Sequence, residues 1–245
     1  STDGNLTIRS VDITNEGEGA DDDWELLDTI EVEVTVKNNG NERIRDVFVE
    51  LGIMDSDGSN NADDLDFTNA DEDKIEIGSI DEGDSKDAVF RFRVPANIDV
   101  GDYKLTVKAY SDDLGEDLEC TDIAETGLSD DLFDRINIDT VTDEDKFVII
   151  EDIILPEQAT CGEAVSGEFT VFNVGKDDED KVKITMKNSE LGLDRTFEIN
   201  SLDQSKHKDM EFSFTLPNNL QNKQYPIAFK TSYDYRSGSY RRESQ

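Results

Sequence analysis

The sequence predicts an all-β protein built from two copies of one β-sandwich. Apolar and polar residues alternate through much of the chain of 245 residues, as in IEVEVTV at 30–36, and this period is typical of half-buried antiparallel strands. The strands also recur in the same order, since 78–95 (GSIDEGDSKDAVFRFRVP) matches 200–217 (NSLDQSKHKDMEFSFTLP). A Gly or Pro marks the same strand edge in each copy, where turns need it. Two tandem sandwiches explain this repeat.

The expected strands divide the chain into two domains. The first copy has strands at 6–13, 30–36, 88–94 and 103–110. Its closing strand is expected from four apolar residues, Phe133, Ile136, Ile138 and Val141. The stretch FVIIEDIILP then opens the second copy, so the predicted domains are 1–145 and 146–245.

The second copy has only YDYRSGSYRRESQ after the counterpart of strand 103–110. We therefore expect either that the chain is a fragment or that domain two lacks its last strand. An incomplete sandwich could accept a strand from a neighbouring molecule.

An acidic insertion separates the two copies. The offset between matching residues is 135 at Gly40 and Gly175 but 122 at Pro95 and Pro217, so the first copy holds 13 extra residues between these points. The acidic stretch 55–73, DSDGSNNADDLDFTNADED, accommodates them. We expect a surface loop at one tip of domain one that the sandwich does not need.

This stretch is also the candidate metal site, because calcium takes six to eight oxygen ligands from a loop that curls around it. The candidate ligands are Asp55, Asp57, Asn60, Asp63, Asp64 and Asp66. The spacing departs from an EF-hand, since Asn60 stands where Gly is required and Asp66 where Glu is usual. The alternative is an acidic loop that holds ions only diffusely.

The charge balance restricts the partners. Sixty Asp and Glu against 24 Lys and Arg give a formal net charge of -36, and this field repels nucleic acid and anionic membrane surfaces. The sequence contains no run of about 18 apolar residues, so none of its segments is predicted to insert into a membrane. The acidity indicates either adaptation to a setting where charge keeps a crowded protein soluble or a surface that collects divalent cations.

The remaining motifs do not indicate an enzyme. His207, the one histidine, lies in a polar turn flanked by lysines and lacks an orienting partner in the sequence. No nucleophile-elbow, phosphate-loop or His-rich metal motif occurs. Asn5 begins a glycosylation sequon. Cys120 and Cys161 lack the doublet spacing of a zinc site, and in an extracellular protein they would form one disulfide.

The strand ends VKNNGN and VFNVG, the strands F-x-F-x-V-P and F-x-F-x-L-P, and the strands GDYKLTV and QYPIAF resemble the CARDB-type immunoglobulin-like modules of prokaryotic cell-surface proteins. The second half, from LPEQATCGEAVSGEF to the turns VGKDDED and NSELG, is similar to predicted S-layer or envelope proteins of DPANN archaea. The resemblance implies two immunoglobulin-like sandwiches in an extracellular, cell-surface protein. It also implies a disulfide between Cys120 and Cys161 that ties the interdomain segment onto the second sandwich.

The sequence thus predicts a structural subunit of an archaeal surface layer or surface filament that assembles with copies of itself. Calcium would relieve carboxylate repulsion between acidic faces. The alternative is an adhesin or glycan-binding module that holds a host or neighbouring cell surface through the 55–73 loop. A third reading is an accessory domain of a surface enzyme.

Overall fold

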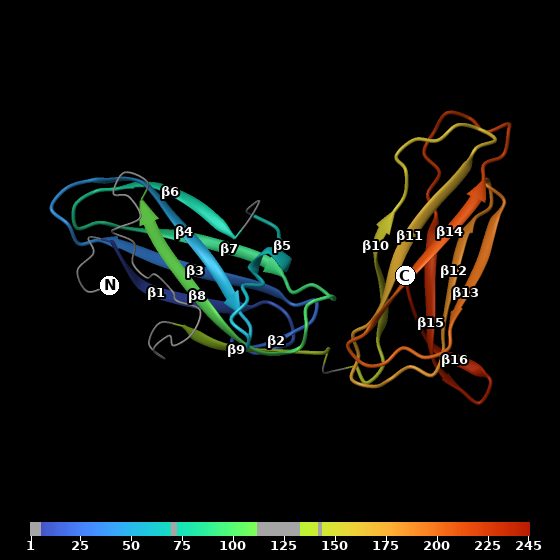
Figure 1. Ribbon diagram of the computed structural model, residues 1–245, viewed down its shortest axis with the longest axis horizontal. Coiled ribbons are helices and arrows are strands. Elements are labelled where there is room, and N and C mark those ends of the chain that lie inside the picture. The colour runs from blue at the N-terminus through green and yellow to red at the C-terminus, as the bar shows by residue number, and fades with distance from the viewer. Residues whose placement is uncertain (1–5, 70–72, 112–132, 142–143) are drawn as a thin grey trace. The chain divides into compact units, whose positions relative to one another are not determined.

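The computed structural model describes residues 6–69, 73–111, 133–141 and 144–245. The chain forms two compact units, Ser1–Asp139 and Thr140–Gln245, which are called domain one and domain two below. Strands make up nearly all the regular structure of both units (Figure 1). The protein is all-β, and each domain is a sandwich of two sheets, as the alternation predicts.

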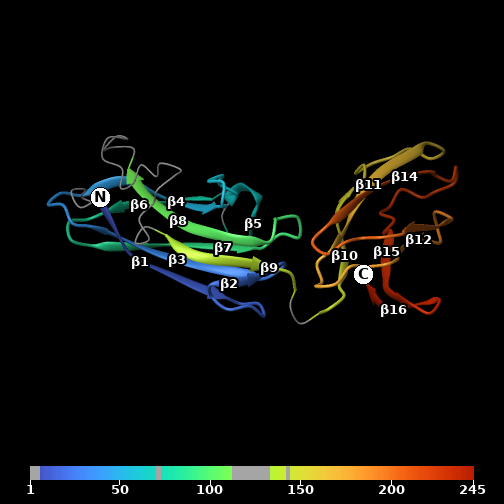
Figure 2. The same ribbon diagram turned by 60° about the horizontal axis from the view of Figure 1, so that its bottom comes forward.

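Domain one packs a four-stranded sheet, β1-β3-β7-β5, against a five-stranded sheet, β2-β9-β8-β4-β6. The first sheet comprises β1 (Leu6–Asn15), β3 (Thr29–Asn38), β7 (Ser85–Arg93) and β5 (Asp66–Phe67). The second comprises β2 (Asp23–Glu25), β9 (Asp134–Asp139), β8 (Gly101–Ser111), β4 (Ile44–Met54) and β6 (Lys74–Ile80). Figure 2 shows both layers with their strands side by side. β9 supplies the closing strand that the apolar pattern at 133–141 predicts.

Domain two repeats this plan with a three-stranded sheet, β10-β11-β14, and a four-stranded sheet, β13-β12-β15-β16. The strands are β10 (Val148–Ile154), β11 (Ala164–Asn173), β12 (Val182–Asn188), β13 (Leu193–Ile199), β14 (His207–Thr215), β15 (Ala228–Arg236) and β16 (Ser239–Ser244). The registers agree between copies: Thr29 pairs with Arg93 in domain one, and Ala164 pairs with Thr215 in domain two. β10, β11, β12, β13, β14, β15 and β16 therefore correspond to β1, β3, β4, β6, β7, β8 and β9.

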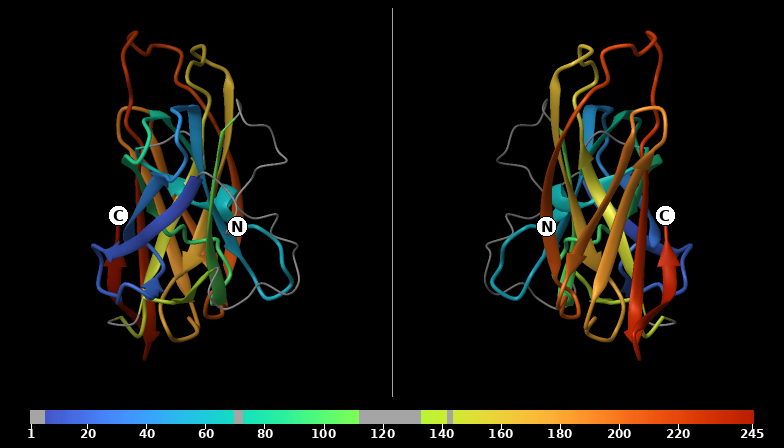
Figure 3. Two further views of the ribbon diagram at one scale, coloured as in Figure 1. Left: turned by 90° about the vertical axis from the view of Figure 1, so that its left-hand side faces the viewer. Right: turned by 90° about the vertical axis from the view of Figure 1, so that its right-hand side faces the viewer.

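The expectation that domain two lacks its last strand is wrong. β16 pairs antiparallel with β15, as β9 does with β8, and the hairpin forms the reddest strands of Figure 3. Its turn has φ of 51° at Ser237 and 86° at Gly238, and two positive φ values give the turn type that matches strand twist. The sandwich is closed by its own chain, so strand donation into a missing β16 position does not apply.

The acidic insertion is also more than a surface loop. It contains a 3-10 turn at Ala62–Asp64 and then β5, which pairs with the edge of β7. The connection from β4 to β6 thus crosses to the opposite sheet. Ala62 is 0% and Leu65 5% exposed, and Phe67 lies against the ring of Phe92. The prediction that the sandwich does not need this stretch is therefore wrong for its second half.

A buried asparagine ends β3 in domain one and the corresponding β11 in domain two. Asn38 Nδ2 donates to the carbonyls of Glu42 and Ile80 at 2.8 and 3.1 Å. Asn173 Nδ2 donates to those of Asp177 and Leu202 at 2.9 and 3.0 Å. The shared Asn-x-Gly of the repeat therefore ties the end of β3 or β11 to the turn that follows it and to the chain at or just after the edge strand of the other sheet.

Candidate functional site

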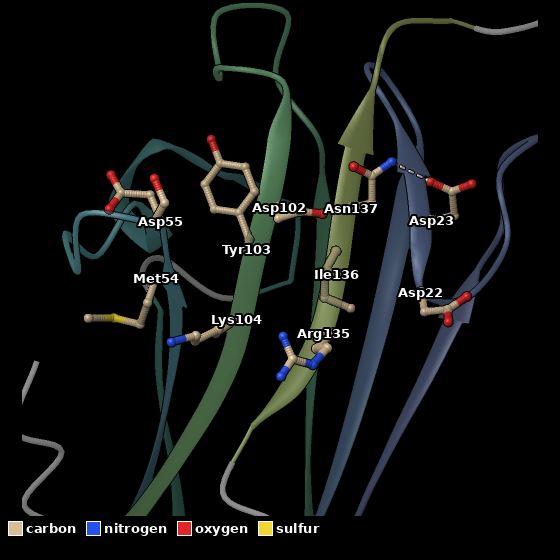
Figure 4. Close-up of a pocket in the computed structure, with 11 residues that line it drawn as sticks. Asp22, Asp23, Met54, Asp55, Asp102, Tyr103, Lys104, Arg135, Ile136 and Asn137 are labelled. Carbon is tan, nitrogen blue, oxygen red and sulfur yellow. Dashed lines mark hydrogen bonds between the residues drawn. The ribbon is translucent and has the colours of Figure 1, made fainter. Parts of the chain in front are cut away.

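A polar groove of about 780 Å³ lies on domain one, over the ends of β2, β9, β8 and β4. Its acidic rim comes from Asp22, Asp23, Asp55 and Asp102. Lys104 and Arg135 lie next to each other on neighbouring strands, to one side of these carboxylates, as Figure 4 shows. The groove therefore places two cations, scarce in this acidic chain, beside four carboxylates.

The basic pair is held in place by an aromatic ring. The Lys104 ammonium lies 4.9 Å and the Arg135 guanidinium 5.3 Å from the ring centre of Phe133, which are cation–π distances. Asn137 of β9 donates from Nδ2 to the Asp23 carboxylate of the neighbouring β2 at 2.7 Å. Charged, amide and aromatic groups thus share one open surface, an arrangement suited to a polar ligand or an acidic protein surface.

Asp55 shapes the tip of the acidic loop by accepting hydrogen bonds within its own turn. Its Oδ1 accepts from the backbone N–H groups of Asp57 and Ser59, both at 2.9 Å, and Gly58 has a φ of 88° that suits glycine. The hydrogen bonds, that of Ser59 foremost, lower the pKa of the Asp55 carboxyl below its ordinary value. This carboxylate is already engaged in the fold of the turn.

The amide of Asn60 is engaged in the same way. Its Oδ1 accepts from the backbone N–H of Ile53 at 2.9 Å and of Ala62 at 3.1 Å. Asp66 lies 3.8 Å from the Arg93 guanidinium. Within the described part of the chain, no group of three or more His, Cys, Asp or Glu side chains is arranged to hold a metal ion. Calcium at Asp55, Asp57, Asn60, Asp63, Asp64 and Asp66 stays a prediction.

Tyr103 lines the groove as a fixed donor. Its hydroxyl donates to the carbonyl of Asp99 at 2.6 Å. Burial, with the nearby carboxylates of Asp99, Asp55 and Asp64, raises the pKa of Tyr103 to about 12. The phenol therefore stays protonated and structural rather than serving as a base.

Each domain also presents an aromatic pair flanked by lysines on the outer side of corresponding sheets. In domain one the rings of Phe48 and Tyr110 stack at 5.7 Å, and Lys74 lies 4.3 Å from the Phe48 ring centre. In domain two the rings of Tyr235 and Tyr240 lie 5.1 Å apart, and Lys183 lies 4.7 Å from the Tyr240 ring centre. We call these the two aromatic–lysine clusters. Aromatic residues are enriched in protein interfaces.

Glu179 is a buried acid that the sequence did not reveal. It belongs to the run DDED at 177–180, which reads as a solvated hairpin, yet Glu179 is 1% exposed. Its Oε2 accepts from the backbone N–H of Asp234 at 2.9 Å, whereas Oε1 lies 3.7 Å from the Lys146 ammonium and has no hydrogen-bond partner among the described residues. Burial raises the pKa of Glu179. In a chain with 60 acidic residues, no sequence signal separates a buried acid such as Glu179 from the exposed ones.

The other predicted site residues lie apart from the groove. Cys161 is an exposed free thiol in the structure, and its predicted partner Cys120 lies outside the described residues. Asn5 of the sequon also lies outside them. The His207 imidazole lies 5.4 Å from the ring of buried Phe172. No helix in the described ranges is long and apolar enough to cross a membrane.

Comparison with known proteins leaves the family open. No protein-family model matches the chain, and no curated protein matches it. Among solved structures, red sea bream transglutaminase is similar over 91% of this chain and 29% of its own, with 11% identity and a TM-score of 0.28. The C-terminal domain of wzt is similar over 55% of this chain and 74% of its own, with 13% identity and a TM-score of 0.39. Neither likeness carries an argument about function.

Proposed function

We propose that the chain is a structural subunit of an archaeal surface layer or surface filament that assembles with copies of itself outside the cell. The observation that carries the proposal is the pair of aromatic–lysine clusters, because corresponding sheets of both sandwiches present the same kind of contact surface. Repeated contact surfaces on one chain allow assemblies that do not close. In a protein of net charge -36, these local cations would meet the acidic surface of a neighbouring copy.

Two further features belong to this proposal. A disulfide between Cys120 and Cys161 would fix the interdomain segment to domain two. Calcium bound along the 55–73 loop would offset repulsion between acidic faces of adjacent copies. Both features would stiffen an assembled layer without adding catalysis, and the proposal includes no enzymatic activity.

The test is the size of particles formed by the intact chain at millimolar calcium and after chelation, followed by light scattering and electron microscopy. We expect regular polymers in calcium that dissolve on chelation. Lys74→Glu with Lys108→Glu, or Lys181→Glu with Lys183→Glu, should prevent growth, because each pair reverses charge at one cluster. Lys206→Glu with Lys208→Glu, away from both clusters, is the matched control. Wild-type protein that stays monomeric in calcium would contradict the proposal.

A second candidate function rests on the groove of domain one. Asp55 and Ser56 of the acidic loop line it together with Lys104 and Arg135, and such mixed polar walls suit a glycan or another polar surface ligand. This favours the adhesin alternative. A monomer that binds cells or a glycan array, and loses binding in Arg135→Ala, would support it over assembly.

A further inference from the structure

One end of the domain two sandwich is open. A cleft of about 1170 Å³ lies between the connections at 155–163 and 216–227. Apolar side chains from the sheet β10-β11-β14 and from both connections line it, among them Leu155, Val165, Phe214, Leu216, Leu220 and Ile227, together with polar side chains such as Gln158, Gln221 and Lys223. These residues belong to or pack against the hydrophobic core of the domain. Val165 and Phe214 are themselves buried, 6% and 8% exposed, so the cleft lies at the edge of the core and is walled by partly buried residues of the connections.

The same end of domain one is covered by its own chain. Trp24, 0% exposed, comes from the connection between β1 and β3 and lies 5.6 Å from the ring of Phe92. The ring of Phe67, from the acidic insertion, lies 5.5 Å from the ring of Phe92. Phe67 belongs to β5, which pairs with β7 on the side opposite β3. Two aromatic side chains thus complete the core over Phe92.

Domain two has neither cover. Phe214 corresponds to Phe92, since Val165 pairs with Phe214 as Ile30 pairs with Phe92. The connection that corresponds to the one carrying Trp24 is LPEQATCGE at 155–163, which contains no aromatic residue. Along β14, the described chain supplies no counterpart of β5. Phe212 is the one described ring in contact with Phe214.

Two exposed isoleucines lie beside this cleft. Ile153 is 45% and Ile154 58% exposed, at the end of β10 directly before Leu155, which lines the cleft. Among the described residues the one other large hydrophobic exposed to this degree is Val100, at 38%, in domain one. The same end thus holds a cleft with apolar side chains in its walls and a pair of exposed aliphatic side chains that can pack against them.

We propose that the open end of domain two, meaning this cleft with Ile153 and Ile154, binds the open end of a second copy of the chain. The isoleucines of each copy enter the cleft of the other and lie against the apolar side chains that wall it, Leu155, Leu216 and Leu220. A patch that carries both the cleft and the side chains that fill it is self-complementary, so the contact has two-fold symmetry and closes at a dimer. This inference rests on the proposed self-assembly and names one of its contacts.

The driving force is the removal of apolar surface from water, which does not depend on calcium. The dimer should therefore form in the presence of a chelator, where the contacts that build larger polymers are absent. Wild-type protein, sedimented over a range of concentrations with chelator, should show a monomer–dimer equilibrium. Ile153→Glu with Ile154→Glu should weaken dimerisation at least about a hundredfold, because each charge would have to be buried in an apolar contact. Both side chains are substantially exposed, so the fold tolerates the change.

Val100→Glu is the matched control, since it changes the third exposed hydrophobic residue in the same way, and it should dimerise like wild type. A second measurement uses Cys161, which lines the cleft. In a Cys120→Ser background, the alkylation of Cys161 by a maleimide should slow as protein concentration rises. The slowing should disappear when the two isoleucine substitutions are added.

A wild-type chain that remains monomeric in chelator overturns this inference. A dimer that the isoleucine substitutions leave intact, or a Cys161 reactivity that does not change with concentration, also overturns it. The larger proposal has a separate readout. If all three proteins form the same polymers in calcium, assembly stands and only this contact is wrong.

Discussion

The two domains share one framework and differ in how it is completed. Asn38 and Asn173 occupy the same position and donate to equivalent pairs of carbonyls, so this link between a strand end and two connections is common to both. Domain one then adds an aromatic cover from two connections, through Trp24 and Phe67. Domain two lacks this cover, and its most deeply buried acid, Glu179, has a side-chain oxygen without a hydrogen-bond partner among the described residues. The strands thus determine the fold, whereas the connections determine what each domain leaves exposed.

The largest effect is expected from removing the cover of domain one. Trp24→Ala should destabilise domain one by about 3–5 kcal/mol, because a fully buried ring is replaced by a cavity over Phe92. The unfolding transition of domain two should not move. Calorimetry of the intact chain, which follows both transitions, measures this difference. Trp24→Phe retains a ring and should lose less. Equal shifts in both transitions would contradict the independence of the two domains.

The equivalent asparagines predict two smaller losses of stability, one in each domain. Asn38→Ala and Asn173→Ala should each cost about 1–3 kcal/mol in their own domain, because buried carbonyls lose their donor. The chain contains one tryptophan, Trp24, so its fluorescence reports the unfolding of domain one. Asn38→Ala should lower the urea midpoint seen by fluorescence, and Asn173→Ala should leave that midpoint unchanged while lowering the second transition seen by circular dichroism. A fluorescence shift in Asn173→Ala would break the comparison.

The buried Glu179 should make the stability of domain two depend on pH. Burial raises the pKa of Glu179 above its ordinary value of 4.5, so the folded domain holds the proton more tightly than the unfolded chain. The stability from this group is full below pH 4.5 and is lost as pH rises through the raised pKa. Glu179→Gln stays neutral and should flatten the stability of domain two between pH 4.5 and neutrality.

The neighbouring Asp180 is exposed, so Asp180→Asn is the matched control and should keep the wild-type slope. Tryptophan fluorescence provides an internal control, because the pH profile of domain one should be the same in all three proteins. A wild-type slope in Glu179→Gln would show that another group in domain two carries the pH dependence.

The sequence predicted the strands well because they obey a local rule. Alternation locates β3, β7 and β8, and the apolar residues Ile136 and Ile138 identify β9 across a long acidic connection. β16 was missed because its strand alternates weakly, although Ser-Gly between Arg236 and Ser239 is a hairpin signal. What a connection does is set by distant partners, so nothing local shows that Phe67 lies on Phe92.

The candidate sites were harder to predict for a related reason. Among 60 acidic residues, an acid that binds an ion, one that caps a turn and one that is buried look alike in the sequence. Asp55 does cap a turn, and Glu179 is buried beside Lys146. Lys104 and Arg135 drew no attention in the sequence, because only the pairing of β8 with β9 brings them together.

The smallest effect is expected at the tip of the acidic loop, whose counterpart in domain two is the short turn between β12 and β13. Asp55→Ala removes the acceptor of the Asp57 and Ser59 amides, so hydrogen exchange at these two amides should accelerate. The fluorescence midpoint should hardly change, because the turn is exposed.

In wild type, the hydrogen bonds lower the pKa of Asp55 below 3.8, so the turn persists below that pH and loosens only as pH falls through the lowered value. The amide shift of Ser59, followed by NMR during acid titration, measures this. Asp55→Asn keeps an oxygen acceptor and should show intermediate exchange without the titration. A midpoint at or above 3.8 would mean that the amides do not stabilise the charged carboxylate.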